Sequence, residues 1–229
     1  MLTGAGISTE SGIPDFRTPG SGLWSKLDPE DFTIQRFQTH PERFYQLGMD
    51  FVETILNSSP NPAHKAIGEM ESLGLVKSVI TQNVDSLHQK GGSRRVIEIH
   101  GTLQTASCML CSKQINIKDA MEEVNQGVIP PRCKECNGLM KPDVTLFGEA
   151  MPPAYQEALA EAQKADGMLV VGSSLVVSPA NILPQFMEKL IIVNRERTPY
   201  NDRADEVISN GISEVVPKLK DALLERKIS

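Results

Sequence analysis

The sequence lacks any long hydrophobic run. Its densest apolar stretches are Met168–Val171 and Leu190–Val193, far short of the roughly 18 residues that a membrane-spanning helix needs. The first residues also lack the basic segment and apolar stretch of a signal peptide, since Thr3 and Gly4 follow Met1 almost at once. We therefore expect no membrane association and a cytoplasmic location.

An excess of basic charge is also missing. The 229 residues carry 23 Lys and Arg against 29 Asp and Glu, a net charge of −6 at pH 7. Nucleic-acid-binding modules depend on a positively charged surface, so we do not expect direct binding of nucleic acid. An acidic chain suits basic partners, such as lysine-rich protein segments. The sequence does not indicate an oligomeric state.

Short apolar segments alternate with amphipathic helical patterns, which is typical of an α/β fold. The length fits one or two domains with a hydrophobic core. Strands are predicted at Val76–Thr81, Val96–Ile99, Val144–Phe147, Met168–Val171, Leu190–Val193 and Val207–Ser209, and helices at Ala63–Leu73, Pro153–Ala165 and from Ile212 onward. Because the strands are apolar throughout, we expect a Rossmann-like parallel sheet with helices on both faces.

Two stretches interrupt this alternation. Residues 18–62 hold several Pro, Gly and aromatic side chains and end in a helical pattern, and residues 101–142 contain all four cysteines. We expect the two stretches to pack together as a small module beside the sheet. The Rossmann-like domain then comprises residues 1–17, 63–100 and 143–229.

Polar residues directly follow four of the predicted strands. These are Gln82-Asn83-Val84-Asp85, His100-Gly101, Gly172-Ser173-Ser174 and Asn194-Arg195-Glu196. In open α/β sheets, ligands bind beyond the carboxyl ends of the strands, so we expect these segments to form one site. For any one of them alone, an ordinary loop is the alternative.

The segment Gly4-Ala5-Gly6 resembles the glycine turn of dinucleotide-binding proteins, in which the backbone approaches a pyrophosphate. Thr9 occupies the place of the third glycine of the G-x-G-x-x-G pattern, so an ordinary tight turn is an equal alternative. Asp15, Phe16 and Arg17 follow and add a carboxylate, an aromatic ring and a guanidinium. Their alternative is a proline-shaped loop with a surface ion pair.

The four cysteines form two C-x-x-C pairs, Cys108 with Cys111 and Cys133 with Cys136, and 21 residues separate the pairs. This pattern is typical of a zinc ribbon, although the separation exceeds the usual range of roughly 15–20 by one residue. Four thiolates fill the coordination shell of zinc, so the single ion is predicted to be structural. Two redox dithiols or two disulfides are the alternatives.

Among the four histidines, only His100 ends a predicted strand and precedes a glycine, where its ring can face the site. A neutral imidazole in that place can act as a general base. His40, His64 and His88 have structural explanations, as a loop residue, a helix residue and a residue that orients the Asp85 loop. His100 is therefore the predicted catalytic residue.

Together these segments resemble the sirtuin family of NAD-dependent protein deacylases. The matching segments, in family order along nearly the whole chain, are GAGIS (4–8), GIPDFR (12–17), TQNVDSLH (81–88), HG (100–101), the two C-x-x-C pairs, KPDVTLFGE (141–149), GSSL (172–175) and VNRE (193–196). Family members usually carry a helix and a full strand before TGAG, whereas this sequence begins two residues before it.

The resemblance implies a role for each matching residue. His100 is the base that acts on the nicotinamide ribose hydroxyls, and Phe16 shields the anomeric carbon. The residues implied to bind the co-substrate NAD are Gly4, Ala5, Gly6, Thr9, Asp15, Phe16, Arg17, Gln82, Asn83, Val84, Asp85, Gly172, Ser173, Ser174, Asn194, Arg195 and Ile212. The peptide with the acyl-lysine docks as an added strand. The residues implied to hold it are Val144, Phe147, Gly148 and Glu149.

The implied reaction is NAD-dependent deacetylation of protein lysine, which gives deacetylated lysine, nicotinamide and O-acetyl-ADP-ribose. Family members that remove succinyl or malonyl groups carry a Tyr-x-x-Arg pair in the helical module, and residues 32–62 lack one. We therefore expect acetylated-lysine proteins as partners. A longer-chain deacylase or a mono-ADP-ribosyltransferase using the same NAD site is the alternative.

Two functions outside this family fit less well. A redox dehydrogenase usually has an acidic residue roughly 20 residues after the glycine turn. Asp28 has about that spacing but lies in the irregular stretch 18–62. A nucleic-acid-binding zinc module conflicts with the negative net charge.

Overall fold

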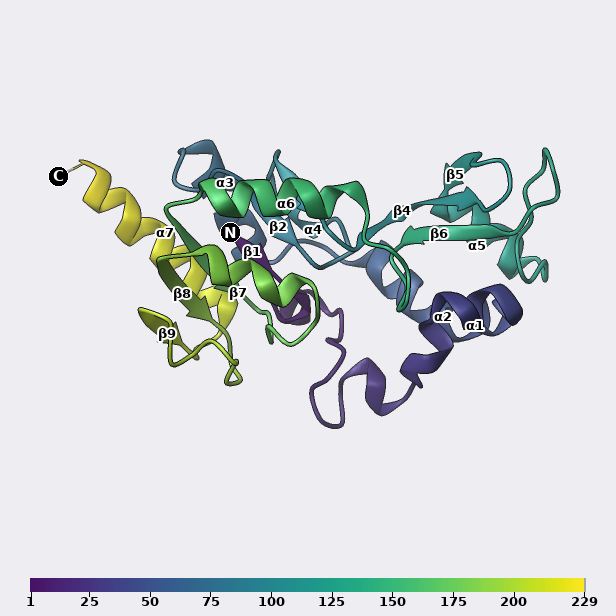
Figure 1. Cartoon of the computed structure of the whole chain (residues 1–229), viewed down its shortest axis with the longest axis horizontal. Coiled ribbons are helices and arrows are strands. Elements are labelled where there is room, and N and C mark those ends of the chain that lie inside the picture. Colours follow the sequence, from purple (N-terminus) through teal and green to yellow (C-terminus); the bar gives the residue numbers. More distant parts are fainter. Residues whose placement is uncertain (229) are drawn as a thin grey trace.

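The computed structural model of the chain describes residues 1–228 and contains two sheets (Figure 1). The larger sheet has six strands in the order β3-β2-β1-β7-β8-β9, and every neighbouring pair is parallel. Its strands are β1 (Leu2–Thr3), β2 (Val79–Thr81), β3 (Val96–Glu98), β7 (Gly167–Val171), β8 (Lys189–Val193) and β9 (Glu206–Ile208). The predicted Rossmann-like parallel sheet is confirmed.

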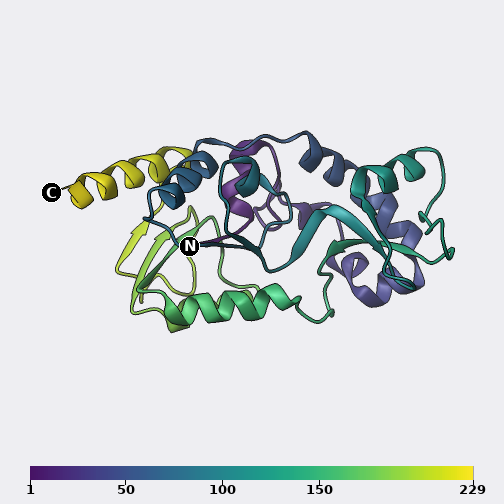
Figure 2. The same ribbon diagram turned by 90° about the horizontal axis from the view of Figure 1, so that it is seen from above.

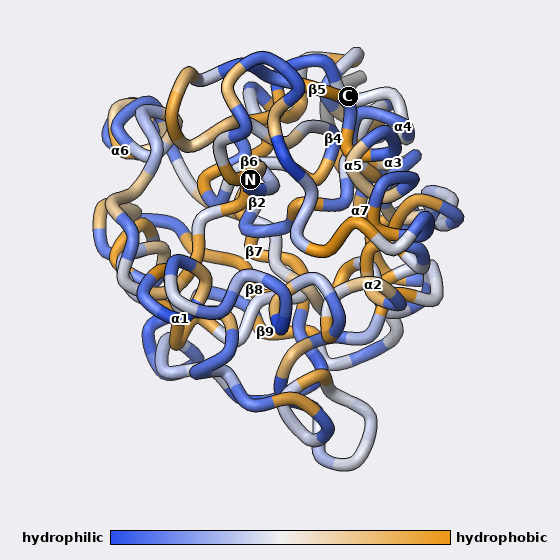
Figure 3. Tube along the Cα trace, turned by 90° about the vertical axis from the view of Figure 1, so that its right-hand side faces the viewer, coloured by the Kyte–Doolittle hydropathy of each residue, from blue (hydrophilic) through white to orange (hydrophobic). Residues whose placement is uncertain are grey.

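Helices cover both faces of this sheet (Figure 2). On one face lies α6 (Pro153–Lys164), and on the other lie α3 (Pro62–Ser72) and α7 (Ile212–Ile228). Neighbouring strand residues alternate between the two cores, since Val170 packs on the α6 side and Val171 on the α3 side. Both are fully buried, and Figure 3 shows the hydrophobic colour of β7 near the centre of the molecule.

Two predicted strands are displaced. The strand predicted from Val76 begins only at Val79, because the backbone amides of Leu75 and Val76 bond to the Met70 carbonyl and close the end of α3. The strand predicted at Val144–Phe147 is instead β6 (Met140–Val144). Beyond β6 the chain leaves the sheet, and Phe147 makes only an isolated bridge to Thr33.

The smaller sheet is antiparallel, in the order β5-β4-β6. It comprises β4 (Gly101–Cys108), β5 (Gln114–Asn116) and β6, with α5 (Ile117–Asn125) packed beside it, and α1 (Ile34–Thr39) and α2 (Pro41–Asn57) lie nearby (Figure 1). Val52 and Ile55 of α2 share one apolar core with Leu103 of β4 and Met121 of α5. Segments far apart in the sequence thus pack together here.

The order in which strands are added to the larger sheet changes sides at β1. From β1 the chain adds β2 and β3 on one side, and then returns to add β7, β8 and β9 on the other. Open parallel sheets bind ligands at such a switch point, beyond the carboxyl ends of the strands. The short helix α4 (Leu87–Lys90) follows β2 at this edge. In residues 1–228, no helix combines the length and apolar character needed to cross a bilayer.

Candidate active site

One cavity of about 570 Å³ collects the segments that follow β1, β2, β3, β7 and β8. Every residue that the sequence implied to bind NAD or peptide lines this cavity, and His100 lines it as well. The structure therefore brings together residues from position 4 to position 212. The four cysteines are not among the lining residues of this cavity.

Direct backbone contact between two loops explains the glycines of the turn. The Gly6 amide donates to the Gly172 carbonyl at 2.8 Å. A Cβ atom on Gly6 would lie 2.8 Å from the same carbonyl oxygen, and Gly172 has a left-handed backbone (φ 64°). Any side chain at these two positions would push the loops apart. The turn after β1 is thereby fixed against the loop after β7.

Amide side chains of the loop after β2 reinforce this contact. Asn83 donates through Nδ2 to the Gly4 carbonyl at 3.2 Å and to Ser8 Oγ at 3.1 Å. Gln82 donates through Nε2 to Ser173 Oγ at 2.8 Å. Asn83 is buried, so its hydrogen bonds are little exposed to competing water. The three loops form one rigid wall of the cavity.

Ser8 is a residue of this wall that the sequence reasoning did not assign. Its hydroxyl donates to Asp85 Oδ2 at 2.6 Å, and both side chains are buried. A buried carboxylate needs such a donor, because an ionised group is costly to bury unpaired. Ser8 could have been predicted as a site residue from its position in the matching segment GAGIS (4–8).

His100 is placed where the two sheets meet. The Ile99 amide bonds to the Thr81 carbonyl, and the His100 carbonyl accepts from the Thr145 amide. His100 Nδ1 lies 3.0 Å from the Gln82 carbonyl oxygen. A carbonyl only accepts, so Nδ1 carries the proton and Nε2 keeps its lone pair. Burial lowers the pKa of His100, although the Gln82 bond opposes this shift, so the ring is neutral at pH 7.

The loop that follows the glycine turn is shaped by Asp15. Its carboxylate accepts from the backbone amides of Arg17 at 2.9 Å and Thr18 at 2.7 Å. The ring of Phe16 stands with its centroid 5.2 Å from that of Trp24. The aromatic side chain is therefore held against the cavity, whereas the carboxylate of Asp15 is occupied by its own loop.

The segment predicted to hold a peptide lies along the same cavity, after β6. Lys141 Nζ bonds to the Val144 carbonyl at 2.7 Å and pairs with Glu149 Oε2 at 3.0 Å. The same Glu149 oxygen accepts from the Leu146 amide at 2.6 Å. This partly buried ion pair fixes the shape of the segment while the Phe147 side chain stays 44% exposed.

The α2 wall of the cavity was not predicted. One face of α2 lines the cavity, with Phe44, Gly48, Val52 and Ile55 all buried. Helical spacing of apolar residues was the available signal, but it indicates a buried face and not what the face borders.

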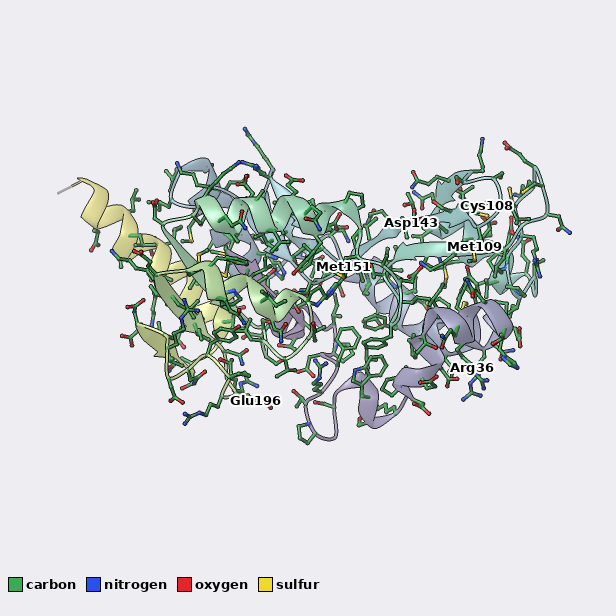
Figure 4. All side chains as sticks on the ribbon, in the orientation of Figure 1. Arg36, Cys108, Met109, Asp143, Met151 and Glu196 are labelled. Atoms are coloured by element: carbon green, nitrogen blue, oxygen red, sulfur yellow. The ribbon has the colours of Figure 1, made fainter. Side chains whose placement is uncertain are left out.

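The four cysteine sulfurs lie within 4.8 Å of one another. The Sγ atoms of Cys108 and Cys136 are 3.4 Å apart, and those of Cys111 and Cys133 are 3.7 Å apart. These separations are close to the roughly 3.8 Å edge of a tetrahedron with zinc–sulfur bonds of about 2.3 Å, and far from a disulfide bond of about 2 Å. The donor set thus fits one structural zinc ion. Figure 4 shows Cys108 on the smaller sheet, apart from Met151, which lines the cavity.

Comparisons with known proteins agree with this arrangement. The chain is 49% identical over 214 residues to NAD-dependent protein deacetylase 2 of Caldanaerobacter subterraneus subsp. tengcongensis, covering 93% of this chain and 86% of that protein. It is 42% identical to NAD-dependent protein deacetylase of Saccharolobus solfataricus, covering 100% of this chain and 93% of that protein.

Solved structures of similar fold carry ligands. A Sir2 structure with p53 peptide and NAD+ has a TM-score of 0.89 and 39% identity, covering 100% of this chain and 92% of that chain. Another, with deacetylated p53 peptide and 3'-O-acetyl ADP ribose, has a TM-score of 0.93 and 39% identity, covering 96% and 91%. The sequence profile of the Sir2 family matches residues 4–179. With this match and these relatives, the chain belongs to the Sir2 family.

Proposed function

We propose that the chain is an NAD-dependent protein lysine deacetylase. Its products are deacetylated lysine, nicotinamide and O-acetyl-ADP-ribose. The observation that carries the proposal is His100, whose neutral ring is anchored by the Gln82 carbonyl within a cavity shared by the glycine turn. Similar chains that are named NAD-dependent protein deacetylases support the same conclusion.

Different residues of the chain have different roles in the proposed reaction. When bound, NAD supplies an anomeric carbon whose leaving group is neutral nicotinamide, so no second acid is required. His100 Nε2 accepts a proton from a ribose hydroxyl, while Nδ1 keeps its own proton and donates it in a hydrogen bond to the Gln82 carbonyl. Asn83 and Asp85 present fixed polar groups to the nicotinamide end, and Phe16 excludes water from the reacting carbon.

Further cavity residues are assigned to the rest of NAD. We assign the adenosine half to the loops after β7 and β8, with Ser173, Ser174, Asn194 and Arg195, and to Ile212 at the start of α7. We assign Gly4, Ala5, Gly6, Thr9 and Arg17, which also line the cavity, to the same co-substrate. The acetyl-lysine peptide adds as a strand along Val144, Phe147, Gly148 and Glu149.

The zinc ion holds the small module together and takes no part in the reaction. Cys108, Cys111, Cys133 and Cys136 supply four thiolates, which leaves no open coordination position for a substrate. The division into a Rossmann-like domain (1–17, 63–100 and 143–229) and a small module (18–62 and 101–142) is part of this proposal. We also propose that acetylated proteins are its partners and that it does not bind nucleic acid directly. Its proposed location is the cytoplasm, where thiols stay reduced.

An acetyl-lysine peptide incubated with the protein and NAD tests the function. Mass spectrometry should detect deacetylated peptide, nicotinamide and O-acetyl-ADP-ribose in equal amounts, and none of them without NAD. Peptide that gains ADP-ribose and keeps its acetyl group would instead identify a mono-ADP-ribosyltransferase. Formation of NADH, followed by its absorbance, would identify a dehydrogenase.

A further inference from the structure

Trp24, the only tryptophan in the sequence, lies between two segments that the proposed function assigns to different substrates. Its ring centroid is 5.2 Å from that of Phe16 and 6.1 Å from that of Phe147. All three side chains line the cavity. Phe16 is assigned to exclude water from the reacting carbon of NAD, and Phe147 belongs to the segment assigned to the peptide. One indole ring therefore neighbours both proposed substrate sites.

Backbone hydrogen bonds support the same connection. The Trp24 amide donates to the Phe16 carbonyl at 3.0 Å. The Trp24 ring lies 5.5 Å from that of Phe32 between centroids, and the Phe32 carbonyl accepts from the Phe147 amide at 3.1 Å. The Phe147 carbonyl in turn accepts from the Ile34 amide at 2.9 Å. A continuous set of contacts thus joins the loop of Phe16 to the peptide segment.

Packing of a hydrophobic core does not explain this indole. Neither Trp24 nor Phe16 belongs to any of the four apolar cores of residues 1–228, and both side chains are only partly buried. Aromatic rings with centroids roughly 4.5–7 Å apart attract each other beyond the area that they bury. Phe16 also neighbours Phe51 of α2, but at the longer distance of 6.2 Å. The orientation of the Phe16 ring therefore depends mainly on Trp24.

We propose that Trp24 is a positioning residue that ties the Phe16 ring to the peptide segment and so keeps water from cleaving NAD. This inference rests on the deacetylase function proposed above. In deacetylation, the acyl oxygen bonds to the anomeric carbon. In the side reaction, a water oxygen bonds there instead, nicotinamide leaves with the electron pair of the broken bond, and a water proton passes to solvent. The products are ADP-ribose and nicotinamide, and the lysine keeps its acetyl group. Exclusion of water from an active site prevents such hydrolysis.

The ratio of nicotinamide released to peptide deacetylated measures this side reaction. With saturating acetyl-lysine peptide and NAD, we expect a ratio close to one for the wild-type protein, because each deacetylation releases one nicotinamide. In Trp24→Ala the ratio should rise at least about twofold, with ADP-ribose as the extra product. Trp24→Phe keeps an aromatic ring and should stay close to the wild-type ratio. Both products come from one sample, so a partly unfolded variant does not distort the ratio.

A second variant tests the connection from the peptide side without changing Trp24. Phe147→Ala should also raise the ratio, and the double variant should show no more than the larger single effect, because both changes break one connection. Lys26 offers a matched control, since it is exposed two residues after Trp24 and does not line the cavity. Lys26→Ala should leave the ratio at the wild-type value.

The inference is overturned if Trp24→Ala lowers turnover while the ratio stays near one, because Trp24 then has only a structural role. It is also overturned if Trp24→Phe raises the ratio as much as Trp24→Ala, or if Phe147→Ala leaves the ratio near one. In each of these cases, deacetylation by the wild-type protein still supports the proposed function. If the wild-type protein deacetylates no peptide, the proposed function itself fails, and this inference with it.

Discussion

Arg43 donates through Nε to the carboxylate of Asp31 at 2.5 Å, and Arg36 approaches the same oxygen at 3.5 Å. Asp31 is 5% exposed, and its pKa is lowered mainly by the Arg43 hydrogen bond, with burial opposing the shift. Arg36 and Arg43 are the two basic residues of positions 32–62 apart from histidine. Neither lines the cavity, so the helical module offers no free cation to a substrate.

This arrangement predicts discrimination against acidic acyl groups. A succinyl carboxylate buried against the apolar α2 wall would lack a partner, and unpaired buried charge is strongly unfavourable. We expect acetyl-lysine to exceed succinyl-lysine in kcat/KM by at least about tenfold, or about 1.4 kcal/mol in transition-state stabilisation. The measurement uses one peptide sequence and saturating NAD. Equal efficiencies would mean that another residue supplies a cation.

Replacing His100 by asparagine should separate its two functions. Asparagine can keep a donor near the Gln82 carbonyl but has no base, so kcat should fall by roughly a hundredfold or more. Circular dichroism and the Tm should match those of the wild-type protein, because His100 is only partly buried. An active, folded His100→Asn variant would exclude His100 as the base.

The pH profile gives a second test of His100. Burial lowers the pKa of His100 below its ordinary value of 6.5, and the neutral ring is the active form. The wild-type kcat/KM should therefore stay level on acidification through pH 7 and fall only below that ordinary pKa. A fall centred above pH 7 would contradict the assignment.

Zinc removal should unfold the small module before the Rossmann-like sheet. Metal binding and folding are coupled in such sites, so binding free energy contributes to stability. We expect elemental analysis to find one zinc per chain, and Cys136→Ser to lower both zinc content and Tm. The neighbouring surface change Glu135→Gln, which removes an exposed ion pair with Lys113, is the control. Zinc-free protein with unchanged Tm and activity would refute a structural ion.

A buried pair of imidazoles should make stability sensitive to acid. His64 and His88 are 0% and 1% exposed with ring centroids 5.0 Å apart, and His64 has no hydrogen-bond partner on either ring nitrogen among the described residues. Burial is the main cause that lowers their pKa values, to about 4 for His64 and about 3 for His88. The unfolded chain, with an ordinary pKa of 6.5, therefore binds protons that the folded chain does not.

Acid should therefore lower the free energy of unfolding. Stability is full above pH 6.5 and declines as the pH falls from 6.5 toward 4 and 3. Each such histidine should cost about 2 kcal/mol of unfolding free energy between pH 7 and pH 5. His64→Leu should flatten this decline without lowering the stability at pH 7. Urea unfolding at both pH values measures it, and an unchanged slope would rule out His64 as a source.

The sequence predicted which polar residues meet at one cavity, but it did not predict that α2 forms part of the cavity wall. Polar residues at strand ends were informative because parallel strands deliver their carboxyl ends to one edge, which brings Gln82, His100 and Ser173 together. The wall formed by α2 could not be predicted, because helical spacing shows that Phe44, Val52 and Ile55 are buried but not what they border. The strand predicted at Val144–Phe147 was misplaced because apolar composition alone does not reveal where pairing with β4 ends.

The position of β1 bears on how the chain folds. This two-residue strand lies in the centre of the sheet, between β2 and β7. Thr3 meets Thr81 across a sequence separation of 78 residues, and its other neighbour, β7, ends at Val171. During synthesis β1 therefore cannot pair with β7 until the ribosome has released the chain beyond Val171. Closing such long loops costs entropy before any contact offsets it, so we expect folding to be slow.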